Sequence, residues 1–434
     1  MENEVKEVAV EEHSSHHHHS HHHHHHHKSS RKKKFSLKRF LKKHKTPVRV
    51  ATLFLVLALT IAATAFTIKQ LDQPSQGGKP TTNQPSAAPQ IPEGQVAVTV
   101  TRFDAPVALH HDIVTTYLNA NISVSAREIL KDYMQTDIRL DHGQPVVISY
   151  DVLGLADGCN VTGFRVEVTE KGQKDPCFRK DCTAGESSVM IYNLKSATSY
   201  QYVVRADFTT MKSITVSGTF ETAAGPRLLK VDGIANVRDF GGWKVGNTTI
   251  KQGLLYRGSE LDGMDQPDFN ITSTGRQVML HDFGIRMEMD LREPAVRSDE
   301  DRLGATVICP TPYAAPFFEA AFAEGRPAMA RVFKDLANPE NYPIYLHCSL
   351  GRDRTGTVCM ILGALLGMEE EDILREYGLS ALYYGGTDYE YAYKVFDGLK
   401  TYGGDTMSEQ AENYLLHIGL TEAEILSLRQ IYLG

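Results

Sequence analysis

Residues 347–356 combine a cysteine and an arginine at a spacing suited to phosphate-ester chemistry. They read His-Cys-Ser-Leu-Gly-Arg-Asp-Arg-Thr-Gly, so that five residues separate Cys348 from Arg354. A thiolate is a strong nucleophile, and a guanidinium can hold two phosphoryl oxygens at once. The segment therefore predicts a loop in which Cys348 attacks phosphorus and Arg354 binds the phosphoryl group.

The sequence on either side of this loop predicts how it is positioned. Residues 342–346 have the apolar character of a short buried strand, and apolar residues recur at helical spacing over 357–366. A loop between a strand and a helix N-terminus directs backbone N–H groups toward an anion. These donors and Arg354 would favour the thiolate, since lowering a thiol pKa by about three units needs roughly 4 kcal/mol.

The other loop positions are expected to support this chemistry. Gly351 suits a tight backbone curl, and the Thr355 hydroxyl is placed to hydrogen-bond the sulfur as it leaves phosphorus. His347 has two interpretations, a residue that orients the loop and a satisfied core histidine. The predicted phosphate-binding set is Ser349, Leu350, Gly351, Arg352, Arg354 and Thr355.

Four further blocks accompany the cysteine loop in the C-terminal half of the chain. They are Asn-Val-Arg-Asp-Phe-Gly-Gly at 236–242, Leu-Tyr-Arg-Gly-Ser at 255–259, a segment ending in Asp-Leu-Arg at 284–292, and the helical tail at 420–426. With the loop, they resemble the atypical bacterial branch of tyrosine and dual-specificity phosphatases, a resemblance that covers 228–434. It implies hydrolysis through a phosphocysteine intermediate. The alternation of strand-like and helix-like segments predicts an α/β phosphatase domain with a mainly parallel central sheet.

The resemblance implies two candidates for the general acid. Ordinary tyrosine phosphatases use an aspartate in a Trp-Pro-Asp setting, and this chain has no such triplet. The atypical branch carries an aspartate inside the loop, where Asp353 stands here, so Asp353 is the preferred acid and later the base for water. Asp290 is the reserve catalytic candidate, and its other interpretation is a structural ion pair with Arg292 or Arg238.

Arg352 keeps more than one substrate class open. The resemblance implies a protein tyrosine or dual-specificity phosphatase, but phosphoinositide-hydrolysing relatives often carry a basic residue at this position. A phosphoinositide or inositol-phosphate phosphatase is therefore the alternative, and an exposed loop charge is the other interpretation of Arg352. A rhodanese-like sulfurtransferase is disfavoured by the Arg-Thr-Gly ending of the loop. We expect no metal or other cofactor in the reaction.

The net charge of −7 conceals a strong asymmetry along the chain. Residues 28–49 hold eleven Lys and Arg and no acid, whereas residues 50–434 hold 34 basic and 48 acidic groups. An acidic body of this size argues against nucleic acid as a partner.

Six cysteines are too few for a disulfide scaffold, although a disulfide between Cys177 and Cys182 is an option outside the cytosol.

An uncharged run of 19 residues at 50–68 is long enough to cross a bilayer. The basic cluster before it predicts a single-pass cell-membrane protein with a cytoplasmic N-terminus and an extracytoplasmic catalytic domain. We expect a His-rich and basic disordered tail at 1–46 and a transmembrane signal-anchor at 47–69, with a cleaved signal peptide as the rival interpretation. The twelve histidines within 13–27 suggest either metal binding or a disordered polar tail.

The middle of the chain changes from a linker to a β-rich module. Residues 70–95 have the composition of a flexible linker, and alternating strand candidates follow over 96–225. A Leu-x3-Thr-x-Tyr pattern at 194–200 resembles fibronectin type III modules, which implies an all-β sandwich pinned by Tyr200. Residues 104–142 do not fit this pattern. Such a module is a spacer or binds a surface protein or glycan, so a surface adhesion protein with weak catalysis is a further alternative.

Overall fold

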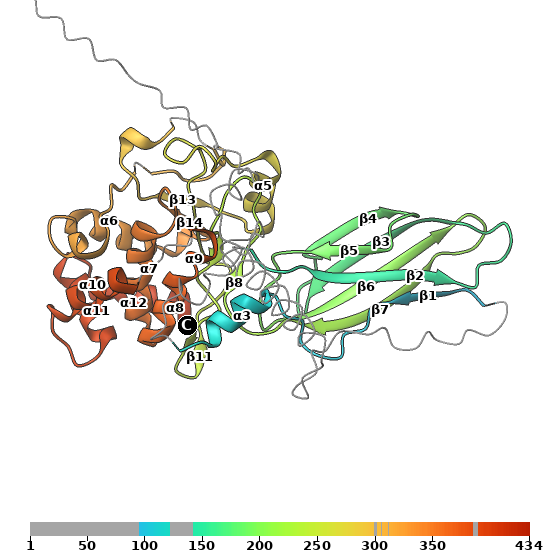
Figure 1. Ribbon diagram of the computed structural model, residues 1–434, viewed down its shortest axis with the longest axis horizontal. Coiled ribbons are helices and arrows are strands. Elements are labelled where there is room, and N and C mark those ends of the chain that lie inside the picture. The colour runs from blue at the N-terminus through green and yellow to red at the C-terminus, as the bar shows by residue number, and fades with distance from the viewer. Residues whose placement is uncertain (1–94, 122–141, 299–301, 305, 311, 385–388) are drawn as a thin grey trace, which may run out of the picture. The chain divides into compact units, whose positions relative to one another are not determined.

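The computed structural model describes most of the chain beyond residue 94 (Figure 1). The described residues are 95–121, 142–298, 302–304, 306–310, 312–384 and 389–434. The predicted tail at 1–46, the predicted signal-anchor at 47–69 and all but the last residue of the predicted linker at 70–95 lie outside them.

No helix among the described residues is both long and apolar enough to cross a lipid bilayer. The longest of these helices has 14 residues, whereas a membrane span needs about 20. This finding contradicts the prediction of a transmembrane helix and of a single-pass protein of the cell membrane. The uncharged run at 50–68, on which that prediction depended, lies outside the described residues.

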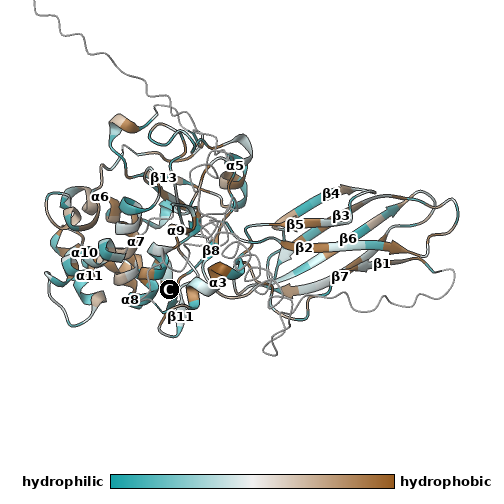
Figure 2. Ribbon diagram, in the orientation of Figure 1, coloured by the Kyte–Doolittle hydropathy of each residue, from teal (hydrophilic) through white to brown (hydrophobic). Residues whose placement is uncertain are grey.

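Seven strands in two antiparallel sheets form the β-rich module. One sheet has the order β1-β2-β5 and the other the order β4-β3-β6-β7. Buried and exposed residues alternate along β2 and β6, as a strand with one face in the core requires, and Figure 2 shows the mixed hydropathy along these strands. The inward side chains of both sheets form a single hydrophobic core. The strands are β1 (Ala97–Val100), β2 (Val146–Leu153), β3 (Val161–Glu170), β4 (Phe178–Thr183), β5 (Ser188–Ile191), β6 (Ser199–Phe208) and β7 (Ile214–Glu221).

Tyr200 connects the start of β6 to the segment before it. Its hydroxyl accepts a hydrogen bond of 2.8 Å from the backbone N–H of Lys195, and its ring stacks on Phe220 at 5.3 Å. Cys177 and Cys182 are both free thiols. The resemblance of this module to fibronectin type III modules remains a prediction.

Helix α3 (Asp112–Asn119) lies within the stretch that the β pattern does not explain. It buries Ile113, Val114 and Tyr117 in the same hydrophobic core as the C-terminal helices. The Tyr117 hydroxyl donates to the carbonyl oxygen of Arg375 at 3.0 Å and lies 2.9 Å from the hydroxyl of Tyr389. The stretch between β1 and β2 therefore supplies a helix to the C-terminal core.

A five-stranded sheet with the order β13-β14-β12-β9-β8 lies in the C-terminal part. Its strands are β8 (Arg227–Leu228), β9 (Arg238–Asp239), β12 (Leu255–Gly258), β13 (Met287–Asp290) and β14 (Ile344–His347). β14 is parallel to β12 and β13, whereas β9 is antiparallel to both β8 and β12. The sheet is mixed, which corrects the predicted mainly parallel sheet. No helix separates β8, β9 and β12 along the chain, and such direct connections favour antiparallel pairing.

Helices α8, α10, α11 and α12 pack around α7, as Figure 1 shows. Every residue of α7 from Thr355 to Leu366 is buried, so this helix forms the centre of the core. Capping boxes at Thr406 and Thr421 fix where α11 and α12 begin. The longer helices are α6 (Arg326–Leu336), α7 (Asp353–Leu366), α8 (Glu370–Gly378), α10 (Tyr389–Lys400), α11 (Met407–His417) and α12 (Glu422–Leu433). The shorter elements are α5 (Ser273–Gln277), a π-helix (Val278–Asp282), 3-10 turns at Pro294–Val296, Phe318–Phe322 and Pro339–Asn341, α9 (Ala381–Tyr384), and the ribbon of β10 (Lys244–Val245) and β11 (Thr248–Thr249).

The register of the sheet brings three strand ends together. His347, the last residue of β14, pairs with Gly258 at the end of β12 and with Asp290 at the end of β13. These are carboxyl ends of parallel strands, the edge at which such sheets place their ligands. Cys348 follows His347 directly and therefore lies at this edge.

Candidate active site

The cysteine loop, residues 348–354, runs from the end of β14 into the first two residues of α7, so the predicted strand and helix on either side of Cys348 are both present. Cys348 is only 3% exposed. Gly351 has a φ of 64°, and a Cβ there would come within 2.0 Å of the carbonyl oxygen of Gly258. A side chain at position 351 would therefore force the loop away from β12.

Side chains outside the loop hold its carbonyl groups. The Asn236 amide donates to the carbonyl oxygens of Leu350 at 3.1 Å and Gly351 at 3.3 Å. Arg257 donates to the Gly351 oxygen at 2.6 Å, and the Tyr384 hydroxyl donates to the Leu350 oxygen at 2.8 Å. These contacts turn the carbonyl oxygens away from the space beside Cys348.

The N–H groups of the same loop have no such partners. Within the described part of the chain, the backbone N–H groups of residues 349–352 donate to no other group. A peptide unit whose oxygen is held on one side directs its N–H to the other side. The loop thus has the geometry of an anion-binding site at the N-terminus of α7.

A buried ion cluster supports Asn236 and Arg257 from behind. Glu376 of α8 accepts hydrogen bonds from Arg238 at 2.7 Å and from Arg257 at 2.6 Å, and Arg238 also donates to Asn236 at 2.6 Å. Burial alone would raise the pKa of Glu376, but the two guanidinium groups lower it below its usual value. Arg238 thus braces the loop and does not enter the reaction site.

A cavity of about 200 Å³ opens beside the cysteine. Arg354 donates to the Ser349 hydroxyl at 2.8 Å inside it, and that hydroxyl also hydrogen-bonds the carboxylate of Asp265. The lining residues are Asp265, Gln266, Phe317, Cys348, Ser349, Leu350, Asp353 and Arg354. The predicted phosphate-binding positions Ser349, Leu350 and Arg354 belong to this lining, together with three residues that the sequence analysis missed.

The missed residues come from two loops far from the cysteine in the sequence. Asp265 and Gln266 follow β12, and Phe317 precedes the 3-10 turn Phe318–Phe322. Neither loop has a motif that separates these positions from other exposed polar or aromatic residues. Only the folded chain brings them to the cavity.

Asp353 lies at the start of α7 and faces the cavity. Its carboxylate accepts hydrogen bonds from the Arg352 guanidinium at 3.0 and 3.2 Å and from the Tyr377 hydroxyl at 3.2 Å. Arg352 also lies over the ring of Tyr384, 5.8 Å from its centre. The carboxylate is thus oriented by Arg352 and Tyr377 and lines the cavity that Cys348 also lines.

Asp290 has a different environment, although it ends a strand beside the loop. Both of its carboxylate oxygens are hydrogen-bonded by Arg292, which also binds Glu260 and Asp262. Burial alone would raise the pKa of Asp290, but the charges of His347 and Arg292 lower it below its usual value. The structure therefore gives Asp290 the ion pair with Arg292, one of the two partners considered from the sequence.

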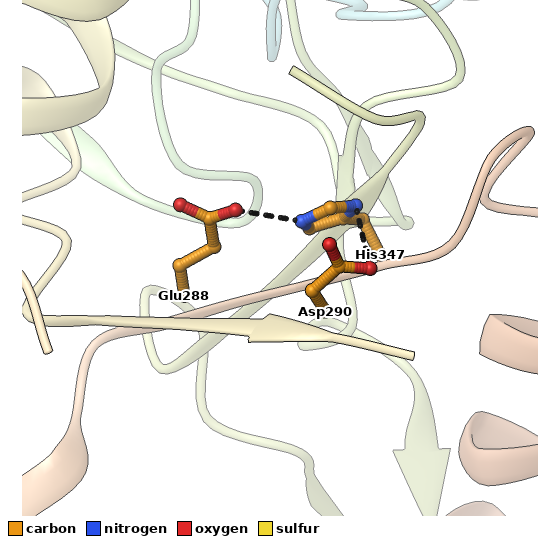
Figure 3. Close-up of side chains that lie close together, drawn as sticks. All are labelled: Glu288, Asp290 and His347. Carbon is orange, nitrogen blue, oxygen red and sulfur yellow. Dashed lines mark hydrogen bonds and ion pairs between the residues drawn. The ribbon is translucent and has the colours of Figure 1, made fainter. Parts of the chain in front are cut away.

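Glu288, Asp290 and His347 form the one described group with the residue types and spacing of a metal site (Figure 3). His347 Nε2 lies 3.0 Å from Glu288, and Nδ1 lies 3.9 Å from Asp290. Burial alone would lower the pKa of His347, but the two carboxylates raise it above its usual value. Both ring nitrogens of His347 thus face a carboxylate, and the three side chains form a buried ion cluster at the ends of β13 and β14.

Thr355 has a hydroxyl that is fully buried and has no hydrogen-bond partner among the described residues. A buried hydroxyl without a partner is costly, because it has lost its water. It lies in the first turn of α7, which begins directly after the cysteine loop. The Thr355 hydroxyl is therefore free to donate a hydrogen bond to an acceptor that forms during the reaction.

Residues 229–434 match the model of the tyrosine phosphatase family. A curated protein of Cupriavidus necator, named as a candidate tyrosine-protein phosphatase, is 28% identical over 179 residues. The matched region is 34% of this chain, and the chain spans 61% of the length of that relative. Among solved structures, the core catalytic domain of the S. cerevisiae PP-IP phosphatase, in complex with citrate, is 15% identical with a TM-score of 0.24, covering 33% of this chain and 82% of that chain. The family match and the curated relative support a cysteine-dependent phosphatase.

Proposed function

We propose that the chain is a phosphomonoester hydrolase of protein tyrosine or dual-specificity type, acting through a phosphocysteine. The observation that carries this proposal is the cavity in which Cys348 and Arg354 lie together. The N–H groups of residues 349–352, which donate to no other described group, belong to the same loop. The oxygens of a dianionic phosphoryl group would accept hydrogen bonds from these N–H groups and from Arg354.

In the first step, Cys348 Sγ attacks phosphorus and the bond from phosphorus to the ester oxygen breaks. Arg354 and the loop N–H groups hold the remaining phosphoryl oxygens as charge develops on them. Asp353 gives its proton to the leaving oxygen, so the products are an alcohol or phenol and a phosphocysteine.

In the second step, water attacks the phosphocysteine and the sulfur leaves as a thiolate. Asp353, now ionised, takes the proton of the attacking water and returns to its starting state. The Thr355 hydroxyl donates to the departing sulfur, which accounts for its lack of a partner in the free protein.

The geometry favours Asp353 over Asp290 as the general acid. Asp353 lines the cavity with Cys348. Asp290 is held by Arg292, and the lowered pKa of Asp290 keeps it ionised and without a proton to donate. Asp353 is therefore the carboxyl group of the cavity that can act on the leaving oxygen.

Phe317 favours an aromatic ester as the substrate. Its side chain is 51% exposed although it lines the cavity. An aromatic ring at the mouth of a phosphate pocket can pack against the ring of phosphotyrosine. Arg352, which suggested inositol phosphates, is already engaged with Asp353 at 3.0 Å.

Hydrolysis of a small aryl phosphate by the purified full chain tests the proposed function. We expect turnover that a chelator leaves unchanged and that Cys348→Ser abolishes, because serine at this position is a much weaker nucleophile. Cys159→Ser is the matched control, since Cys159 lies between two strands of the β-rich module, and it should retain full activity. Turnover that survives in the Cys348→Ser variant would reject the proposal.

A further inference from the structure

The cavity beside Cys348 carries a carboxylate that the proposed mechanism does not use. Asp265 lines the cavity, although it belongs to the loop after β12 and not to loop 348–354. The residue is exposed, and its carboxylate nevertheless contacts the Ser349 hydroxyl. A negative charge therefore stands at the entrance that an anionic ester has to pass.

The hydrogen bonds around Ser349 can have only one direction. An ionised carboxylate only accepts hydrogen bonds, and a guanidinium only donates them. The single hydroxyl proton of Ser349 therefore goes to Asp265, while its oxygen accepts from Arg354 at 2.8 Å. Through this chain Asp265 helps to fix the orientation of the guanidinium that binds phosphate.

The backbone of the Asp265 loop is itself held in place. The N–H groups of Asp265 and Gln266 both donate to the carboxylate of Glu260, the former at 3.1 Å. Glu260 is fully buried and pairs with Arg292, which also binds Asp262 of the same loop at 2.9 Å. The carboxylate of Asp265 is thus built into the entrance of the cavity and is not a freely moving surface charge.

The charges that line the cavity suit one phosphate and not two. Among the described residues, the lining has one guanidinium, that of Arg354, and two carboxylates, those of Asp265 and Asp353. Arg352 lies nearby, but its guanidinium is already engaged in two hydrogen bonds to Asp353. The reacting phosphoryl group takes Arg354, so a second phosphate beside it would meet Asp265 without a free cation.

We propose that Asp265 is a specificity-determining residue that admits esters with a single phosphate and disfavours ligands with a second phosphate beside it. The inference rests on the proposed function in one respect, namely that the cavity binds a phosphoryl group. It narrows the substrate class toward isolated phosphomonoesters, such as phosphotyrosine, and away from inositol rings with adjacent phosphates.

Equilibrium binding of two matched ligands tests this inference. The full chain with Cys348→Ser binds without turnover, and calorimetry compares phenyl phosphate with catechol bisphosphate, which adds one adjacent phosphate to the same ring. We expect Asp265→Asn to shift the ratio of the two affinities toward the bisphosphate by roughly three- to tenfold, the range for a charge at a partly solvated rim. This shift should shrink at high salt, which a merely structural effect would not do.

Asp268→Asn is the matched control, because Asp268 is an exposed aspartate of the same loop that does not line the cavity. It should leave the ratio unchanged.

In Asp265→Asn, asparagine can still accept the Ser349 proton, and any loss of Arg354 orientation would weaken the binding of both ligands alike and leave the ratio intact. An unshifted ratio in Asp265→Asn overturns the inference even if the enzyme hydrolyses phenyl phosphate. Absence of turnover in the native chain, with the ratio shifted, overturns the proposed function alone, and absence of binding by both ligands overturns both.

Discussion

Two aspartates beside the same cysteine loop differ in what their carboxylates contact. Asp290 is bound through both oxygens by Arg292, and this ion pair lies in the interior. Asp353 meets Arg352 and the Tyr377 hydroxyl from one side and the cavity from the other. A charge that is buried and paired contributes to structure, whereas a carboxylate that faces a cavity can exchange a proton with a ligand.

Replacing Asp353 by asparagine should slow hydrolysis in a way that depends on the leaving group. Phenol is a poor leaving group that needs a proton, so kcat for phenyl phosphate should fall by roughly 10²- to 10³-fold. Nitrophenol leaves readily as its anion, so its ester should be affected much less. Steady-state kinetics with both esters checks this, and an equal loss for both would remove Asp353 as the acid.

Asp290→Asn serves as the comparison for this experiment. It removes one partner of a buried guanidinium, so we expect a loss of stability and the same fractional loss of activity with both esters. A leaving-group dependence in Asp290→Asn and not in Asp353→Asn would reverse the assignment of the acid.

The sequence could predict the part of the site that is local in the chain. Cys348, Asp353 and Arg354 lie within one loop, and the types and spacing of its residues suffice to indicate phosphate chemistry. Asp265 and Phe317 reach the same cavity from distant loops. Their role depends on tertiary contacts, which no short pattern records.

At the scale of elements, two neighbouring strands share a buried charge cluster. His347 of β14 faces Glu288 and Asp290 of β13, and parallel pairing sets these positions beside each other. The cluster lies directly before Cys348, so it fixes the strand end from which the cysteine loop begins. The ring is fully buried and paired with Glu288, as expected of a satisfied core histidine. It also lies 3.3 Å from the Cys348 carbonyl oxygen, as expected of a residue that orients the loop, so the two interpretations of His347 are compatible.

The stability of the protein should depend on pH through His347. Burial alone lowers its pKa, but Asp290 and Glu288 raise the folded-state pKa above the ordinary value of 6.5. The stabilisation from its charge is therefore fully present below about pH 6.5, the unfolded-state pKa, and is lost as pH rises through the folded-state pKa. Urea unfolding at a series of pH values should show the free energy of unfolding falling over this window.

His347→Gln is the variant that isolates this effect. Glutamine can hydrogen-bond Glu288 but does not titrate. The free energy of unfolding should therefore fall less steeply with rising pH, because one titrating group has been removed. His281→Gln is a control, since this histidine lies outside the cluster in the π-helix Val278–Asp282. A native decline that persists unchanged in His347→Gln would show that another group causes it.

The sequence predicted individual elements of the C-terminal part better than their arrangement. The strand before Cys348 and the helix after it follow from apolar patterns over a few residues. β8 and β9 have only two residues each, which is too short for any alternating pattern, and their antiparallel pairing makes the sheet mixed. The predicted parallel sheet was wrong because such short strands carry no signal of direction.

At the scale of the whole molecule, α3 has the least expected place. It follows β1 of the β-rich module in the sequence, but Ile113, Val114 and Tyr117 belong to the core of the C-terminal helices. The Tyr117 hydroxyl lies 2.1 Å from where a Cβ at Gly378 would be, so only glycine permits this contact with α8. α8 also carries Glu376, whose ion pairs with Arg238 and Arg257 support the cysteine loop.

Tyr117 lies between β1 and β2 in the sequence, but α3 packs in the C-terminal core. Tyr117→Ala should therefore destabilise the C-terminal part. Removal of a fully buried aromatic side chain typically costs about 3–5 kcal/mol. Tyr117→Phe keeps the ring and removes only one of the two donors to the Arg375 carbonyl, which the Leu379 N–H also reaches, so it should cost only about 1–2 kcal/mol. Phosphatase activity measured at increasing concentrations of denaturant would report both losses of stability at the cysteine loop.

The matched control for Tyr117 is Tyr202→Ala, which removes a buried tyrosine from the core of the β-rich module instead. If α3 is part of the catalytic core, activity should be lost at lower denaturant in Tyr117→Ala than in Tyr202→Ala, since Tyr202 makes no contribution to the core around α7. The opposite order would mean that α3 can detach without consequence for the site. The order of the two transitions therefore decides whether the stretch between β1 and β2 is only a connection or a part of the core that supports the cysteine loop.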